Sequence, residues 1–282
     1  MKVTIREIIN EYKDKFENIQ DIYSIIKYVT EMDNLEISLN KELNLPEEYK
    51  TKIINCLEKI INDNYPLQYL THTQAFFNEN YYVNDNVLIP RQDTEILVEK
   101  AIDYIRNENI KNAIDLCTGS GAIGISVARN SDVEKVLLID ISEGALDVAK
   151  RNIEDNFMED KVSVLKSNLL DETIKSNIKT DMILSNPPYI KSKDMASLDA
   201  NVKYEPSLAL DGGATGMYFY EKIVEQAKYV LNNNGLLIFE IGYDELEQMK
   251  ELIAKNKEYT MLESVKDYGG NDRVVVCRFQ QM

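Results

Sequence analysis

Strand-like and helix-like segments alternate from about residue 110 to the end of the chain, and this alternation constrains the fold most strongly. Short apolar runs typical of strands lie at residues 113–117, 136–140, 162–165, 182–184, 236–241 and 274–279. Segments with helical character lie between them, at residues 123–129, 142–156 and 218–231. Such alternation predicts an α/β fold, in which helices cover both faces of a mostly parallel sheet. Gly269-Gly270-Asn271-Asp272 is typical of a hairpin turn and indicates an antiparallel last strand.

The N-terminal part of the chain has a different pattern. Its first 70 or so residues contain no glycine and carry apolar residues at helical spacing. Thr4 and Glu7 match a capping box, Asp21 could cap a second helix, and Pro46 could open a third. The apolar stripes predict the core of a small bundle. We therefore expect a helical bundle over residues 1–75, a linker with a β-hairpin over 76–90, and the α/β domain over 91–282.

Charge and composition exclude several classes of function. The chain carries 32 basic and 48 acidic residues, and its net charge of −16 argues against direct nucleic-acid binding because it repels a phosphate backbone. No run approaches the roughly 18 apolar residues of a membrane span, and the N-terminus lacks an apolar signal core. Three dispersed cysteines and a single histidine, His72, offer neither a disulfide framework nor a metal site. We expect a cytoplasmic protein without a bound metal or a membrane partner.

A glycine-rich loop follows the first strand of the α/β region. Gly119-Ser120-Gly121-Ala122-Ile123-Gly124 fits the G-x-G-x-x-G pattern, which brings a backbone close to a ligand at a helix N-terminus. A tight structural turn would explain this pattern equally well. Asp140 ends the next strand, 21 positions after Gly119, where a carboxylate binds both hydroxyls of a ribose. Asp140 could instead cap a helix, although Ser142 suits that role better. Loop and carboxylate together predict an adenosine-containing cofactor, either a dinucleotide or S-adenosylmethionine.

The tetrapeptide Asn186-Pro187-Pro188-Tyr189 directly follows the strand at 182–184. Two prolines end the strand and keep the chain extended. The Asn186 carboxamide oxygen and the Pro187 carbonyl can accept the two hydrogens of one planar NH2 group, and Tyr189 offers a flat face to it. A loop that merely ends the strand is the alternative interpretation. An NH2 receptor serves a methyltransferase, which must align a weak nitrogen nucleophile, so it favours S-adenosylmethionine over a dinucleotide.

With these motifs the chain resembles the release-factor glutamine methyltransferases. The resemblance runs in order from about Asn64 to the end, and its segments are Pro66-Leu67-Gln68-Tyr69, Pro90-Arg91-Gln92-Asp93-Thr94-Glu95, residues 115–123, Asn186-Pro187-Pro188-Tyr189-Ile190, Glu205-Pro206 with Ala209-Leu210, and residues 267–274. The Asn-Pro-Pro-Tyr motif alone is shared with DNA-adenine and guanine-N2 RNA methyltransferases. The segment from Pro90 to Glu95 and the ending at Arg273 are more specific to this family.

The resemblance implies a Rossmann-like class I methyltransferase domain with a seven-stranded sheet, preceded by a bundle that recognises the release factor. S-adenosylmethionine is the implied cofactor and S-adenosylhomocysteine the product. The implied cofactor-binding residues are Cys117, Thr118, Gly119, Ser120, Gly121, Asp140, Asn168, Leu169 and Asn186. The glycine loop would face the methionine moiety, Asp140 the ribose, and Asn168 with Leu169 the adenine. The implied catalytic residues are Asn186, Pro187 and Tyr189, and these three bind the substrate together with Pro188.

The implied reaction methylates N5 of the glutamine in the Gly-Gly-Gln motif of peptide-chain release factors, the expected partners of a monomeric enzyme. A ribosomal-protein glutamine, N6 of adenine in DNA, and a non-catalytic adapter role are the alternatives. Three positions depart from the family pattern: Cys117 and His72 stand where glycine is usual, and Asn168 stands where aspartate is usual. An asparagine at 168 can still contact the adenine amino group. We expect His72 to be a linker or packing residue, because methylation of an amide needs no strong base.

Overall fold

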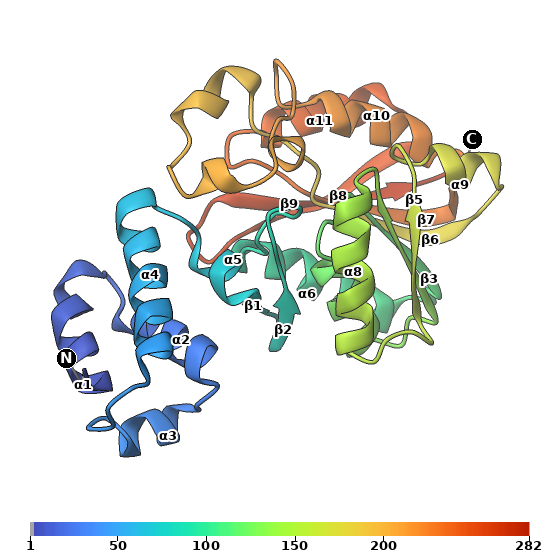
Figure 1. Ribbon diagram of the computed structural model, residues 1–282. Helices are drawn as coiled ribbons and strands as arrows, with labels where there is room; N and C mark the ends of the chain where they lie inside the picture. The colour runs from blue at the N-terminus through green and yellow to red at the C-terminus, as the bar shows by residue number, and fades with distance from the viewer. Residues whose placement is uncertain (1–2, 282) are drawn as a thin grey trace. The chain divides into compact units, whose positions relative to one another are not determined.

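The computed structural model describes residues 3–281, which form two compact units (Figure 1). The first unit comprises residues 3–73 with 199–204, and the second comprises residues 74–198 with 205–281. Each unit has a hydrophobic core of its own.

The first unit is helical. Its elements are α1 (Ile5–Tyr12), η1 (Lys13–Lys15), α2 (Ile19–Thr30), α3 (Asn34–Leu39), α4 (Glu47–Asp63), α5 (Leu67–Thr71) and the short turn η4 (Val202–Tyr204). The apolar stripes of these helices meet in one cluster, and its fully buried members include Ile5, Ile8, Ile22, Ile25, Ile26, Ile53 and Leu57. The segment that contains η4 is attached to the end of α4, where the Tyr204 hydroxyl donates to the Asp63 carbonyl at 3.0 Å.

Two of the three predicted helix starts are confirmed, those at Thr4 and at Pro46, which is the N-cap of α4. Thr4 and Glu7 form the capping box of α1. The N-cap of α2 is Asn18, whose side chain accepts the Gln20 N–H, so the prediction that Asp21 caps this helix is wrong. Asp21 lies in the first helical turn, where its charge still favours the positive end of the helix dipole.

The second unit contains a seven-stranded sheet and a two-stranded hairpin, of which only the first residue, Thr73, belongs to the first unit. The hairpin strands are β1 (Thr73–Phe76) and β2 (Glu79–Tyr82). The strands of the large sheet are β3 (Asn112–Leu116), β4 (Lys135–Asp140), β5 (Val162–Lys166), β6 (Thr180–Ser185), β7 (Leu231–Glu240), β8 (Tyr259–Lys266) and β9 (Asp272–Phe279). The helices of this unit are α6 (Glu95–Asn107), α7 (Ala122–Asn130), α8 (Glu143–Asp155), α9 (Asp171–Lys175), α10 (Tyr218–Ala227) and α11 (Leu246–Lys255), with the turns η2 (Gln92–Thr94), η3 (Ser192–Ser197) and η5 (Ser207–Ala209).

The sheet has the strand order β5-β4-β3-β6-β7-β9-β8. The first five strands in this order are parallel, and β9 is antiparallel to both β7 and β8. The predicted α/β class, the seven-stranded mostly parallel sheet and the antiparallel last strand are therefore confirmed. The chain reverses its direction of sheet growth between β3 and β6, and such a switch point is where open α/β sheets bind ligands.

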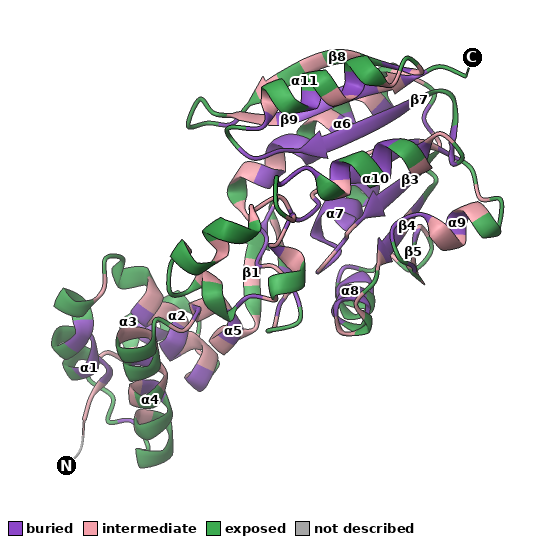
Figure 2. Ribbon diagram, turned by 90° about the horizontal axis from the view of Figure 1, so that it is seen from above, coloured by how far each residue is buried: buried purple, intermediate pink, exposed green. Residues whose placement is uncertain are grey.

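Alternate residues of the central strands face opposite helix layers, as the pleat of a strand requires. In β3, Ala113 packs into the cluster with α6, α7 and α8, whereas Ile114 packs into the cluster with α10 and α11. Strands β3, β4 and β7 are largely buried, and α10 and α11 expose their outer faces (Figure 2). Burial on both faces explains why these strands are continuous apolar runs in the sequence.

Some elements differ from the expectation. Helices α3, α5, α6 and α9 and strand β8 were not predicted, and β7 begins at Leu231, where a helix was expected to end. The pairing of β7 with β6 shifts register between Thr180 and Met182, so the first residues of β7 are an irregular extension of the apolar run. The hairpin of β1 and β2 starts at Thr73, before the predicted segment 76–90.

Candidate functional site

The glycine-rich loop joins β3 to α7 through three residues in the left-handed backbone region. Cys117, Gly119 and Gly121 have φ angles of 60°, 54° and 84°. Glycine adopts this region without steric cost, which explains the two glycines and also why glycine is usual where Cys117 stands. A Cβ atom on Gly121 would lie 3.1 Å from side-chain atoms of both Ile125 and Leu138, so this position is closely packed as well.

Asp115 anchors the loop from below. Its Oδ2 accepts the Thr118 hydroxyl at 2.6 Å and the Gly124 N–H at 2.9 Å. The side chain is fully buried, and its Oδ1 has no hydrogen-bond partner within residues 3–281. Burial raises the pKa of this carboxyl group to about 7, although both hydrogen bonds oppose the shift. Asp115 thus ties the start of the loop to the first turn of α7.

Asp140 ends β4 and contacts the same loop from the side. Its Oδ2 accepts the Gly119 N–H at 2.9 Å, and its Oδ1 accepts the Ser142 N–H at 2.9 Å. Burial raises the pKa of Asp140, while these N–H groups favour the ionised form and oppose that shift. A carboxylate has about four lone-pair positions, so each oxygen can accept one further hydrogen bond from a ligand hydroxyl.

These loops surround a cavity of about 320 Å³ at the carboxyl ends of β3, β4 and β6. Nine of the predicted site residues line it: Cys117, Thr118, Gly119, Ser120, Asp140, Asn168, Leu169, Asn186 and Pro188. An adenosine-containing cofactor fits this arrangement, because a Cβ on Gly119 would meet no atom within 4 Å and open space therefore faces the loop backbone beside the Asp140 carboxylate.

The Asn186 corner lies at the end of β6. The two prolines are buried, and the chain then pairs with the segment that follows η5: Ile190 N–H donates to the Leu210 carbonyl at 3.0 Å, and Gly212 N–H donates to the Ile190 carbonyl at 2.8 Å. The predicted extended course after the prolines is confirmed. The Asn186 Nδ2 donates to the Thr94 Oγ1 at 3.4 Å, a long hydrogen bond that leaves the carboxamide oxygen available as an acceptor.

Three predicted residues have other positions. Within residues 3–281, Gly121, Pro187 and Tyr189 are not among the residues that line the cavity. Gly121 serves the turn into α7. Tyr189 is half-buried against the core on the α10 and α11 face, and this burial, reinforced by the nearby Glu240 carboxyl, raises the pKa of its hydroxyl. The substrate-binding roles of Pro187 and Tyr189 stay predictions.

Sequence reasoning assigned no role to several residues that shape the cavity. Thr94 contacts Asn186, and Arg91 forms an ion pair with the buried Glu205, whose second oxygen accepts the Ile89 N–H at 3.1 Å. Burial raises the pKa of Glu205 and the Arg91 charge opposes that shift. Arg91, Thr94 and Glu205 all stand in segments that carry the family resemblance, and this was the available signal. Tyr218 and Phe219 at the start of α10 also line the cavity.

The described part of the chain has neither a metal-binding cluster nor a helix suited to a membrane. Across residues 3–281, no group of three or more His, Cys, Asp or Glu side chains is placed to hold a metal ion. None of the helices described there is long and apolar enough to cross a membrane.

Comparison with known proteins gives close relatives along the whole chain. A methyltransferase small domain family model matches residues 92–202. The release factor glutamine methyltransferase of Clostridium acetobutylicum is 36% identical over 96% of this chain and 94% of its own length. That of Clostridium botulinum is 38% identical over 92% of this chain and 91% of its own. A solved ribosomal protein L11 methylase from Lactobacillus delbrueckii subsp. bulgaricus, 19% identical, has a TM-score of 0.52 over 71% of this chain and 84% of that one, a likeness of fold alone.

Proposed function

Because the chain belongs to the release factor glutamine methyltransferase family and is a methyltransferase, we propose that it methylates N5 of the glutamine in the Gly-Gly-Gln motif of peptide-chain release factors, with S-adenosylmethionine as methyl donor. The family predicted from the motifs is confirmed by these relatives. The observation that carries the substrate assignment is Asn186, which lines the cavity with its amide nitrogen bound to Thr94 and its oxygen left to accept.

We propose that the residues around the glycine loop bind the cofactor. We assign the ribose hydroxyls to Asp140, the adenine to Asn168 and Leu169, and the methionine moiety to the loop from Cys117 to Gly121. When bound, S-adenosylmethionine supplies an electrophilic methyl group on its sulfonium. The loop backbone is positioned for this ligand before binding, because Asp115 and Asp140 already hold Thr118 and Gly119 by hydrogen bonds.

The enzyme's task is to orient a weak nucleophile. An amide nitrogen has little lone-pair density, so the reaction depends on alignment rather than on a base. The Asn186 oxygen and the Pro187 carbonyl each accept one hydrogen of the substrate NH2 group, and the Tyr189 ring packs against its plane. Held in this way, the nitrogen would have its lone pair directed at the methyl group that the cofactor supplies, and after methylation it would release one proton to water. Tyr189 is no base here, since its hydroxyl has a raised pKa.

The helical first unit is the proposed recognition domain for the release factor. The enzyme is proposed to act as a monomer without direct nucleic-acid contact, in keeping with its net charge of −16.

One assay tests the substrate assignment. Tritiated methyl transfer is measured to a release factor, to its Gly-Gly-Gln variant with alanine in place of glutamine, to ribosomal proteins, and to duplex DNA. We expect incorporation into the intact release factor only. Equal labelling of the alanine variant, or labelling confined to DNA or to ribosomal protein, contradicts the assignment. No labelling of any acceptor by protein that binds S-adenosylmethionine favours a non-catalytic role.

A further inference from the structure

A buried carboxyl group lies behind the Asn186 corner. Glu240 is the last residue of β7, which pairs with β6, the strand that Asn186 follows. Glu240 is only 2% exposed. The pairing of β6 with β7 brings Asn186 beside it, and the Thr94 hydroxyl and the Asn186 amide are close enough that both lower the pKa of this carboxyl group. Among the described residues, its Oε2 has no partner of good hydrogen-bond geometry. The carboxyl group therefore has unused acceptor capacity directed at two residues of the site.

When Glu240 is ionised, hydrogen bonds among these three side chains can run in only one direction. A carboxylate only accepts, so a hydrogen bond between it and the Thr94 hydroxyl has Thr94 as the donor. Having used its hydrogen, the Thr94 oxygen must accept from Asn186, and the Asn186 Nδ2 is placed to donate at 3.4 Å. The NH2 half of the carboxamide is then turned toward the protein interior. The oxygen half is left for the cavity.

We propose that Glu240, acting through Thr94, is a positioning residue that keeps the Asn186 carboxamide oxygen turned toward the substrate amide. The inference rests on the proposed function, in which that oxygen accepts a substrate N–H. A carboxamide has nearly the same shape in its two flipped orientations, so only hydrogen-bond polarity distinguishes them. With the flipped orientation, an NH2 group would face the NH2 group of the substrate, and neither would find an acceptor.

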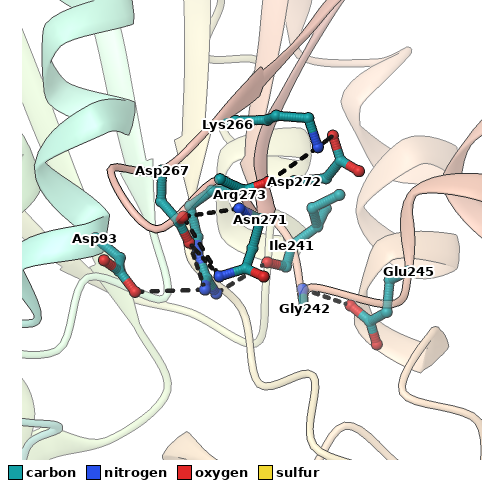
Figure 3. A network of polar contacts seen from close by, with 10 residues as sticks. Asp93, Ile241, Gly242, Glu245, Lys266, Asp267, Asn271, Asp272 and Arg273 are labelled. Carbon is teal, nitrogen blue, oxygen red and sulfur yellow. Dashed lines mark hydrogen bonds and ion pairs between the residues drawn. The ribbon is translucent and has the colours of Figure 1, made fainter.

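Several charged or titratable groups surround Glu240. Arg273 of β9 lies nearby and stabilises the carboxylate, whereas Asp93 of η2 opposes it. Arg273 also pairs with Asp93 at 3.3 Å and donates to Asp267 at 2.9 Å, so one arginine connects η2, which contains Thr94, to the β8–β9 hairpin (Figure 3). The hydroxyls of Tyr189 and, on α10, Tyr220 complete this environment, and Tyr220 donates to the Glu240 backbone carbonyl at 2.9 Å.

This environment makes the orientation sensitive to pH. Burial raises the pKa of Glu240 to about 7, although Thr94 and Arg273 oppose the shift. Above that pH the carboxylate fixes the direction of the hydrogen bonds. Below it, a protonated Glu240 can donate to Thr94, and the Thr94 hydroxyl can then donate to the oxygen of a flipped Asn186 carboxamide. The flipped orientation is therefore satisfied by hydrogen bonds as well. Turnover should therefore fall as the pH drops through about 7.

The orientation can be followed without turnover. The side-chain NH2 signals of Asn186 are recorded by NMR in protein labelled with 15N-asparagine, and they are identified by their absence from N186A. In the wild type we expect the chemical shifts of these signals to change with pH, with a midpoint near pH 7. In E240Q, where the titrating group is gone, they should stay in place. Signals that do not move in the wild type, or that move equally in E240Q, overturn the inference whether or not a release factor is methylated.

Kinetics give the second measurement. E240Q should lower kcat by about 10²-fold, as small errors in alignment do. It should also abolish the pH step and leave the affinity for S-adenosylmethionine unchanged. Thr94→Val should lose the pH step, and Thr94→Ser, which keeps the hydroxyl, should retain it. E245Q is the matched control: Glu245 is also buried with a pKa raised to about 7, but it accepts the Gly242 N–H and does not line the cavity.

The outcomes separate the two proposals. If the wild type methylates no release factor while the Asn186 signals titrate with Glu240, the proposed function fails and the positioning role stands. If the release factor is methylated and E240Q keeps the wild-type kcat and pH step, the positioning role fails and the function stands. Equal losses in E240Q and E245Q would show a general effect of removing a buried acid and also overturn the inference.

Discussion

The Asp140 carboxylate binds the Gly119 N–H at 2.9 Å, so the end of β4 fixes the glycine loop that follows β3. Asp140→Ala should therefore weaken S-adenosylmethionine binding by about 1–3 kcal/mol. The ribose would lose a charge-assisted acceptor, and the loop would lose the hydrogen bond from Gly119. Calorimetry with the purified protein measures this directly. Asp140→Asn keeps one acceptor oxygen and should have an intermediate affinity. Unchanged affinity in Asp140→Ala would show that the ribose binds elsewhere.

Asn186→Ala should reduce turnover by about 10²–10³-fold, equivalent to about 2–4 kcal/mol, since it removes the acceptor that aligns the substrate nitrogen. The affinity for the release factor should change much less. Asn186→Asp keeps an acceptor but loses the donor to Thr94, so its activity should also fall without loss of the fold. Steady-state kinetics and circular dichroism of both variants provide the measurement. Full activity in Asn186→Ala would falsify the assignment of the corner.

Gly212 allows close approach to the backbone of the Asn186 corner. A Cβ there would lie 2.6 Å from the Tyr189 Cα, and backbone cannot move aside as a side chain can. Gly212→Ala should destabilise the protein by about 1–3 kcal/mol in urea unfolding and lower turnover as well. Gly144→Ala in α8 is the control, because the three atoms nearest to its new Cβ belong to the exposed Asn86 side chain, which can move aside. Similar losses in both variants would contradict this explanation.

Arg91 and Glu205 form an ion pair of which only the carboxylate is buried. Arg91→Ala should lower the free energy of unfolding by about 1–3 kcal/mol, because Glu205 is left buried without its charged partner. Glu205→Gln should cost less on its own. If the pair is responsible, the double variant should be more stable than the sum of the two single losses indicates. Strict additivity in urea midpoints would show that the two side chains act independently.

Asp115 should make stability depend on pH. Its folded-state pKa of about 7 lies above the unfolded value of 3.8, so between about pH 4 and 7 the folded state binds the extra proton. Stability contributed by this group is therefore present at low pH and is lost as the pH rises toward 7. Asp115→Asn cannot titrate. We expect the urea midpoint of the wild type to fall relative to that of Asp115→Asn between pH 5 and pH 8, and parallel curves would refute the raised pKa.

The sequence by itself determined the features that depend on local periodicity and on backbone chemistry. Continuous apolar runs marked the buried strands, the stripe through Ile22 and Ile26 marked a bundle helix, and two prolines marked the end of β6. The glycine loop and Asp140 were also identified, because both stand at fixed positions relative to strand ends. These features could be predicted because burial and restricted backbone angles limit which residue type stands at each single position.

Only the tertiary structure decided which distant side chains meet. Nothing local to Thr94, Asn186 or Glu240 shows that they form one cluster, because that depends on how β6 and β7 pair and on where η2 packs. The backbone angles could not be inferred from the sequence either. His72, the residue that caps the end of α5, has a φ of 54°, which explains why glycine is usual there. Sequence periodicity fixes which face of an element is buried, but the contacts that build the site form between elements far apart in the chain.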